Sequence, residues 1–202
     1  MSIETNLMEM NKSLKKLKES GVYDVEKYSY ALLHQTNQLE YFYCHLVKDG
    51  DCDQTYYHVH KRPHIHELAY FNIGRGFPKE LMDGHWCYVL KDMGYKMLVL
   101  PCTSIKEDST PANPSFEKDI TIKTDKHITY CRIQLSDIRS IDIQRLDLRK
   151  PFYHVLTDQQ EILEFVEKIY LISNSLSCMI RSYMWGNYRW KSFYVDVKRG
   201  YQ

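Results

Sequence analysis

The sequence predicts an α+β protein, in which a block of strands is preceded and followed by helical segments. Residues 66–104 contain three mostly apolar stretches with the alternation of strands, and Gly74, Gly76 and Gly94 interrupt them. Two helical patterns come before this block and a third follows it, beginning near residue 157. At 202 residues, the chain suits one domain with a helical appendage.

The first 50 residues predict a helical hairpin. An apolar side chain recurs at alternating spacings of four and three, which places one stripe on a helix that stops at Gly21: Ile3, Leu7, Met10, Leu14 and Leu17. A second helix is expected from Asp24, which can cap it, to about Lys48. The hairpin cannot bury both of its apolar stripes alone, so it must dock on the rest of the chain or on another copy. It is a packing or dimerisation element, or a regulatory or partner-binding arm.

A polar link over residues 49–63 carries part of a histidine run: His58, His60, His64 and His66. On a strand, side chains two residues apart share a face, so each His-x-His pair could bind a transition metal. No carboxylate or cysteine completes a recognisable ligand spacing, and the leading interpretation of the sequence includes no metal and no cofactor.

The block at residues 66–104 is expected to be strand, glycine-bearing loop, strand, tight turn and strand. Strands are predicted at residues 68–73, 86–90 and 96–100. Polar and charged side chains lie between and just beyond them: Arg75, Lys79, Glu80, Asp83, His85, Thr103, Ser104 and Lys106. A rigid scaffold would therefore present an acid, a histidine, cations and two hydroxyls from neighbouring loops, which is how binding and catalytic groups are usually mounted.

Beyond this block, residues 105–119 predict a long loop, and strands are expected at 120–124 and 128–133. Residues 137–146 predict a short helical turn followed by a strand, and a capped helix should run from residue 157 to about 180. The C-terminal extension, residues 173–202, interleaves aromatic and cationic side chains. Such a segment suits single-stranded RNA, or it forms a terminal hairpin at Gly186-Asn187 that covers the core.

Bulk composition narrows the setting. With 27 basic and 26 acidic residues the net charge is +1. This nearly neutral charge argues against a protein that wraps duplex nucleic acid, which needs a strong positive electrostatic field. Six scattered cysteines form no Cys-x-x-Cys pair; four of them lie in apolar runs, and burial as free thiols is the expectation. The start lacks an apolar or arginine-rich targeting pattern, and no apolar run approaches the ~20 residues that span a bilayer. A cytoplasmic protein without membrane contact is expected.

Two motifs in order carry a resemblance to a known family. The first is Gly74-x-Gly76, then Glu80, then Gly84-His85, then a strand ending in Leu100-Pro-Cys-Thr-Ser104. The second runs from Cys131 to Leu146 and contains Ile-Arg-x-Ile-Asp-x-x-Arg-Leu. Together they resemble the MazF/PemK family of toxin endoribonucleases, over residues 64–172. The resemblance implies an SH3-like MazF/PemK-type β-barrel, a homodimer, single-stranded RNA as substrate, and an antitoxin protein that blocks it.

The chemistry that the resemblance implies is metal-independent RNA cleavage, as an mRNA interferase-like toxin of a toxin–antitoxin or phage-defence system. Such cleavage needs a base for the 2′-hydroxyl proton, an acid for the departing 5′-oxygen, and charge or donors on the phosphate. The predicted catalytic residues are His85, Thr103, Glu80 and Arg75. The predicted substrate-binding residues are Gly76, Lys79, Gly84, Ser104 and Lys106.

The chain departs from the family pattern at the catalytic arginine. The family usually has Gly-x-Arg-Pro there, and this chain has His85 and Trp86, whereas the family threonine is matched by Thr103. Either His85 performs acid–base chemistry while Arg75 holds the phosphate, or cleavage has been lost. The alternative function is a catalytically inactive MazF-like module that binds RNA or protein. A third possibility is a metal-dependent nuclease that uses the His-x-His pairs.

Overall fold

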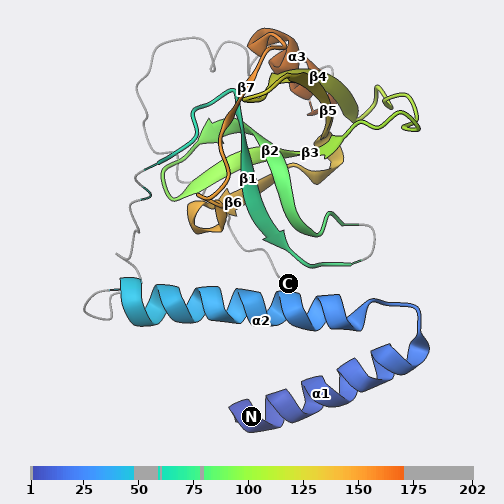
Figure 1. The fold of residues 1–202 in the computed structure, drawn as a ribbon, viewed down its shortest axis with the longest axis vertical. Coiled ribbons are helices and arrows are strands. Elements are labelled where there is room, and N and C mark those ends of the chain that lie inside the picture. Colours follow the sequence, from blue (N-terminus) through green and yellow to red (C-terminus); the bar gives the residue numbers. More distant parts are fainter. Residues whose placement is uncertain (1, 48–58, 60, 78–79, 171–202) are drawn as a thin grey trace, which may run out of the picture.

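The computed structural model describes residues 2–47, 59, 61–77 and 80–170. Within these residues, two helices, α1 (Ile3–Ser20) and α2 (Val25–Tyr41), precede seven strands, and α3 (Gln159–Tyr170) follows them (Figure 1). The strands are β1 (Glu67–Gly74), β2 (Asp83–Asp92), β3 (Lys96–Ser104), β4 (Glu117–Lys123), β5 (Ile128–Gln134), β6 (Arg139–Asp142) and β7 (Tyr153–Val155). The α+β class is confirmed.

Six of the strands close into an antiparallel barrel. The hydrogen-bonded order is β2, β1, β7, β4, β5 and β3, and β3 returns to β2. The edge of β3 away from β2 serves two partners: Lys96–Val99 pair with β6, and Cys102–Ser104 pair with β5. Closure joins β2 to β3, so among the described strands the sheet ends at β6, which pairs with β3 alone.

The barrel has two apolar clusters because successive side chains of a strand point to opposite faces. The inner cluster draws on all six barrel strands, and Ile162 of α3 completes it; its members are Leu68, Tyr88, Leu100, Cys102, Ile120, Ile122, Cys131, Ile133, Leu135, Val155 and Ile162. The second cluster lies on the outer face of β1, β2 and β3 beneath β6 and the 3₁₀ turn Ile143–Arg145: Val59, Ala69, Phe71, Cys87, Val89, Met97, Val99, Ile141, Ile143 and Leu146.

The two N-terminal helices form a hairpin whose ends match the prediction. Ser2 and Asp24 cap α1 and α2, since their side-chain oxygens accept the backbone N–H groups of Thr5 and Lys27. Gly21 ends α1 in the left-handed conformation, with φ of 67°. The α-helical part of α2 stops at Tyr41, earlier than predicted, and a π-helical turn continues it over Phe42–Leu46. In Figure 1, α2 lies between the barrel and α1.

The predicted strands are present, with two corrections. The loop expected over residues 105–119 ends at residue 116, because Glu117–Asp119 already pair with β5. Strand β7 was not predicted: it has only three residues, too few to show alternation. The cap of α3 is confirmed, since Asp158 Oδ1 accepts from the N–H groups of Gln160 and Glu161.

Three of the six cysteines are buried free thiols, as expected: Cys87, Cys102 and Cys131. Burial raises the pKa of Cys87 to about 12 and also raises the pKa of Cys102, so these two thiols are unreactive. Cys44 is exposed, against expectation, and Cys52 and Cys178 lie outside the described residues. Among the described helices, none is long and apolar enough to span a membrane.

Candidate functional site at the ends of β2, β3 and β5

The register of the barrel brings His85 and Thr103 together. Trp86 of β2 pairs with Cys102 of β3, so the adjacent register position places His85 opposite Thr103. On its other edge, Thr103 pairs with Arg132 of β5, and Arg132 in turn pairs with Asp119 of β4. Directly paired residues share a face of a sheet. His85, Thr103, Arg132 and Asp119 therefore form one row across four strands on the outer face of the barrel, which we call the polar row.

Arg132 is the residue that the sequence interpretation missed. Its side chain is only 9% exposed, and its Nε and Nη2 atoms donate to the two carboxylate oxygens of Asp119 at 2.6 and 3.1 Å. Nη1 donates to the carbonyl oxygen of Thr110 at 2.7 Å. The hydrogen bond with Asp119 raises the pKa of Arg132, so the guanidinium stays charged. A single arginine between Cys131 and Ile133 in an apolar strand was the available signal, because a buried charge needs partners.

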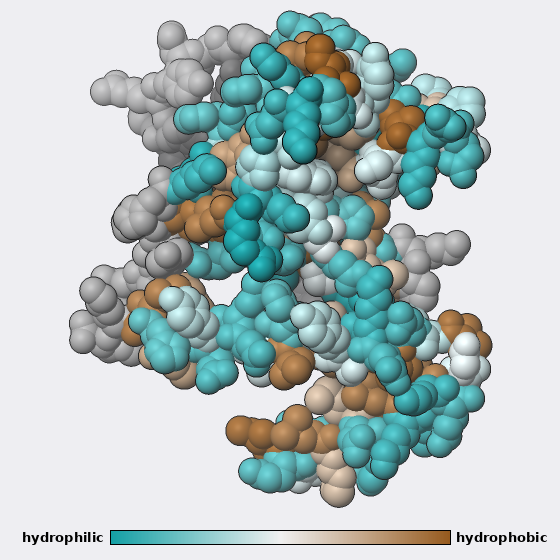
Figure 2. Space-filling model, viewed as in Figure 1, coloured by the Kyte–Doolittle hydropathy of each residue, from teal (hydrophilic) through white to brown (hydrophobic). Residues whose placement is uncertain are grey.

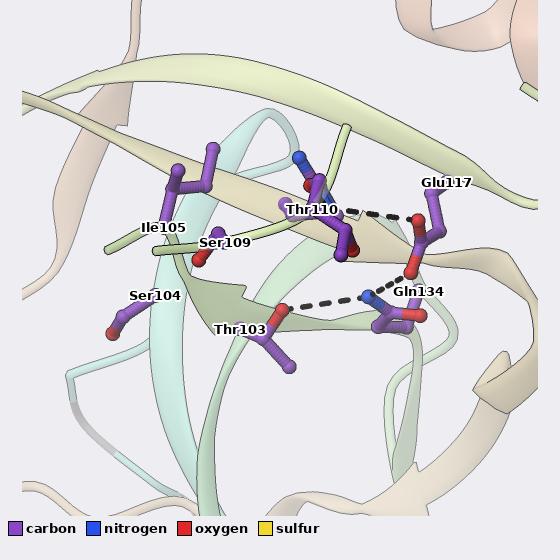
Figure 3. Close-up of a pocket in the computed structure, with 8 residues that line it drawn as sticks. Thr103, Ser104, Ile105, Ser109, Thr110, Glu117 and Gln134 are labelled. Carbon is purple, nitrogen blue, oxygen red and sulfur yellow. Dashed lines mark hydrogen bonds and ion pairs between the residues drawn. The ribbon is translucent and has the colours of Figure 1, made fainter. Parts of the chain in front are cut away.

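Thr103 is connected to Glu117 through Gln134. Gln134 Nε2 donates to Glu117 Oε1 at 2.9 Å and to Thr103 Oγ1 at 3.4 Å (Figure 3). Glu117 also accepts the backbone N–H of Asn113, a hydrogen bond that lowers its pKa. The threonine hydroxyl can still donate its own proton, since here it acts as the acceptor.

These side chains border a small cavity of about 160 Å³, lined by Thr103, Ser104, Ile105, Ser109, Thr110, Glu117, Arg132 and Gln134. It is smaller than the ~300–1,000 Å³ of ordinary small-molecule sites. A site of this size suits one group of a larger molecule, such as a phosphate of a polymer, better than a whole nucleotide.

His85 lies in an environment that favours the neutral imidazole. Its Nδ1 atom is buried and has no hydrogen-bond partner among the described residues. Burial lowers the pKa of His85, and Arg139 lowers it further, against the opposing charges of Asp83 and Asp137. A neutral imidazole at pH 7 can accept a proton, as a general base must.

Arg75 is engaged elsewhere. Its Nε and Nη2 atoms each donate to an oxygen of Asp83 at 2.8 Å, and its side chain is 6% exposed. The hydrogen bond to Asp83 raises the pKa of Arg75, with a smaller contribution from Tyr23 in the turn between α1 and α2. Lys27 of α2 lies 3.4 Å from Asp83. Burial opposes ionisation of Asp83, but hydrogen bonds and charge from Arg75 and Lys27 outweigh it and lower the pKa.

The other predicted acid and the two glycines have local partners. Glu80 Oε2 accepts the N–H of Phe77 at 3.1 Å, and it lies so close to Gly76 that a Cβ there would collide with it. At Gly84, a Cβ would collide with the Tyr70 ring, which packs edge-on against Trp86. Gly84 is therefore needed for packing, whatever it contributes to binding.

Of the remaining predicted binding residues, Ser104 lies exposed at the cavity, and Lys106 lies in the exposed loop that follows. The backbone N–H of Lys106 donates to Ser109. Lys79 lies outside the described residues.

The histidine run shows no metal centre in the part of the chain that is described. His66 Nδ1 is hydrogen-bonded to the Tyr88 hydroxyl at 3.0 Å, and burial lowers its pKa. Among the described residues, no group of three His, Cys, Asp or Glu side chains could hold a metal ion. His58 and His60, like the aromatic extension 173–202, lie outside the described residues.

Comparison with known proteins adds no relative. No family profile matches the chain, and no curated protein matches it. The barrel and the polar row are therefore the observations on which a functional conclusion must rest.

Proposed function

We propose that this protein is a metal-independent endoribonuclease that cleaves single-stranded RNA at the polar row. The observation that carries the proposal is the strand register: Thr103 pairs with Arg132, and the Trp86–Cys102 pair puts His85 at the next position, opposite Thr103 on the same face. These residues supply a titratable base, a hydroxyl donor and a permanent cation, which cover the base and the phosphate-stabilising groups that RNA cleavage without a metal requires. In this proposal the barrel is an SH3-like barrel of the MazF/PemK type. The protein acts in the cytoplasm as a toxin, and an antitoxin protein inhibits it.

In this mechanism, the 2′-oxygen of a ribose attacks the adjacent phosphorus and the bond from phosphorus to the 5′-oxygen breaks. His85 takes the proton of the 2′-hydroxyl. Thr103 and Arg132 stabilise the negative charge that builds on the phosphate oxygens. The departing 5′-oxygen takes up a proton from water, because Glu80, the predicted second proton-transfer group, accepts the N–H of Phe77 through its carboxylate. The products are a 2′,3′-cyclic phosphate and a 5′-hydroxyl, so atoms balance without a cofactor.

Arg132 takes the place that the sequence interpretation gave to Arg75 as the phosphate-holding cation. Both guanidinium groups are paired with aspartate, but Arg132 borders the cavity beside Thr103, whereas Arg75 is covered by its pairing with Asp83. Pairing with an acid reduces the attraction of each arginine for an anion. That observation favours a second candidate function, an inactive module that binds RNA or protein through the same face.

Cleavage of a long single-stranded RNA in the presence of EDTA tests the proposal. The native protein is compared with His85→Ala and Thr103→Val. Matched controls are His127→Ala, in the exposed β4–β5 turn, and Thr121→Val, on the outer face of neighbouring β4. We expect cleavage by the native protein and both controls, fragments that end in a 2′,3′-cyclic phosphate, and a loss of at least ~100-fold in each site variant.

If the folded native protein leaves the RNA intact, the nuclease proposal is wrong, and RNA binding measured under the same conditions then tests the binding module. Cleavage that persists in both site variants would place the chemistry elsewhere. Cleavage that EDTA abolishes would instead support a metal-dependent nuclease.

A further inference from the structure

Helix α1 exposes an apolar stripe. Within α1, all of whose residues are described, none is buried. Exposure along the stripe rises toward the N-terminus, from 39% at Leu17 and 42% at Met10 to 54% at Leu7 and 74% at Ile3, and only Leu14 is half-buried. In Figure 2 the edge of α1 that faces α2 is hydrophobic over much of its length. A contiguous apolar surface of this kind marks an interaction site.

The spacing of the stripe fits another helix. Its five residues recur at intervals of four and three, the a/d repeat of helices that pack side by side at a shallow angle. The 18 residues of α1 give a helix of about 27 Å, long enough for four or five layers of side chains. Helices α1 and α2 diverge from the hairpin turn (Figure 1), near which Lys18 pairs with Glu26. Leu39 of α2 is 50% exposed.

The distribution of charge along α1 favours a second copy of α1 as its partner, in antiparallel orientation. The first half carries Glu4 and Glu9, and the second half carries Glu19 and four lysines: Lys12, Lys15, Lys16 and Lys18. Two copies of α1 in antiparallel orientation place the acidic half of each helix beside the basic half of the other, whereas parallel copies place lysine beside lysine. On a helix of 3.6 residues per turn, Glu4 and Lys18 flank the stripe on the same side, so they would meet twice across an antiparallel pair.

We propose that two copies of this chain associate through their hairpins, with α1 antiparallel to α1 of the partner. The pairing is isologous: the same surface is used by both copies, so it closes at a dimer. Burial of the two stripes would convert two open helical pairs into a four-helix arrangement. This association does not depend on any chemistry at the polar row.

The first test measures the mass of the full chain by sedimentation equilibrium over a range of concentrations. Leu7→Glu is compared with Met8→Glu, since Leu7 and Met8 are 54% and 53% exposed in neighbouring positions. Met8 lies about 140° around the helix from the stripe, so only Leu7 should face the partner. We expect a native dimer, a dissociation constant raised at least ~100-fold by Leu7→Glu, and little change in Met8→Glu. Circular dichroism melting checks that both variants fold.

The second test addresses orientation in a Glu26→Gln background, which removes the 2.7 Å ion pair of Lys18 inside the hairpin. Glu4→Lys alone and Lys18→Glu alone should each weaken the dimer about fivefold, because like charges then meet across the antiparallel pair. The double variant restores opposite charges and should recover the affinity.

A native protein that stays monomeric at the highest concentrations overturns the proposal, and the stripe then has another occupant. A dimer that persists in Leu7→Glu also overturns the proposal, because a surface other than the α1 stripe would then form the dimer. If the double variant is no tighter than the single ones, antiparallel pairing is wrong.

Discussion

The barrel and the helical hairpin bury their apolar side chains to very different extents. In the barrel, Phe71, Tyr88, Met97 and Leu100 are completely buried, and two clusters fill the inner face and part of the outer face. In the hairpin, Val25 is the one buried residue of the two helices. Both regions have good local signals for their secondary structure, including caps at both helix starts. The difference shows that periodicity specifies a helix or strand, but burial depends on what that element meets.

The largest expected difference between the two regions is in stability. Leu100→Ala removes a fully buried side chain of the inner cluster and should lower the free energy of unfolding by about 2–5 kcal/mol. The same change at Leu33 of α2, which is 57% exposed, should cost less than about 0.5 kcal/mol. Urea unfolding of the two variants measures both values. Equal losses would mean that the hairpin packs as tightly as the barrel.

Ion pairs should show the same contrast on a smaller scale. Arg132→Ala leaves Asp119 without its partner and removes the cation from a nearly buried position, so we expect a loss of about 2–3 kcal/mol. In the hairpin, Lys12 forms an exposed pair with Glu9, and Lys12→Ala should cost less than about 0.5 kcal/mol. The comparison is again made by urea unfolding. An Arg132→Ala variant as stable as Lys12→Ala would contradict a structural role for Arg132.

The pH dependence of stability should originate in the barrel. Burial lowers the pKa values of His66 and His85 in the folded protein. At pH values between these lowered pKa values and the ordinary histidine pKa of about 6.5, the unfolded chain binds more protons than the folded chain. The free energy of unfolding therefore falls as the pH is lowered from about 7.5 to 5. Replacing both histidines by glutamine should flatten this slope in urea unfolding, whereas His127→Gln keeps both buried imidazoles and should not. A slope unchanged by the double substitution would contradict the assignment.

The smallest expected effect concerns the contact between the two regions. Lys27 of α2 lies 3.4 Å from Asp83 and is 60% exposed, so Lys27→Ala should lower the free energy of unfolding by about 0.5 kcal/mol or less. Asp83 keeps its bidentate pair with Arg75 in that variant. Thermal unfolding followed by circular dichroism measures the change, and a loss of several kcal/mol would show that this contact holds the hairpin on the barrel.

Local sequence was sufficient for most of the elements and for part of the candidate site. Alternation of apolar and polar side chains predicted strands β1 to β5. The helix ends were predicted from Asp24 and Asp158, which accept local hydrogen bonds, and from Gly21, which adopts the left-handed conformation. The pairing of Arg132 with Thr103 could not be predicted, because it depends on the register of strands about 30 residues apart. The Arg75–Asp83 pair was equally hidden, since both residues flank a loop whose shape local patterns do not determine. Arg75 was therefore predicted as a phosphate ligand.

Amide hydrogen exchange at two protein concentrations tests most directly the claim that the barrel is complete in one chain and the hairpin is not. Amides of β2 and β3 should be strongly protected at both concentrations, because their strands are paired on both edges within one chain. Amides of α1 should exchange rapidly in dilute protein and gain protection when the concentration is raised above the dimer dissociation constant. Protection of α1 that matches the barrel and does not change with concentration would contradict the account.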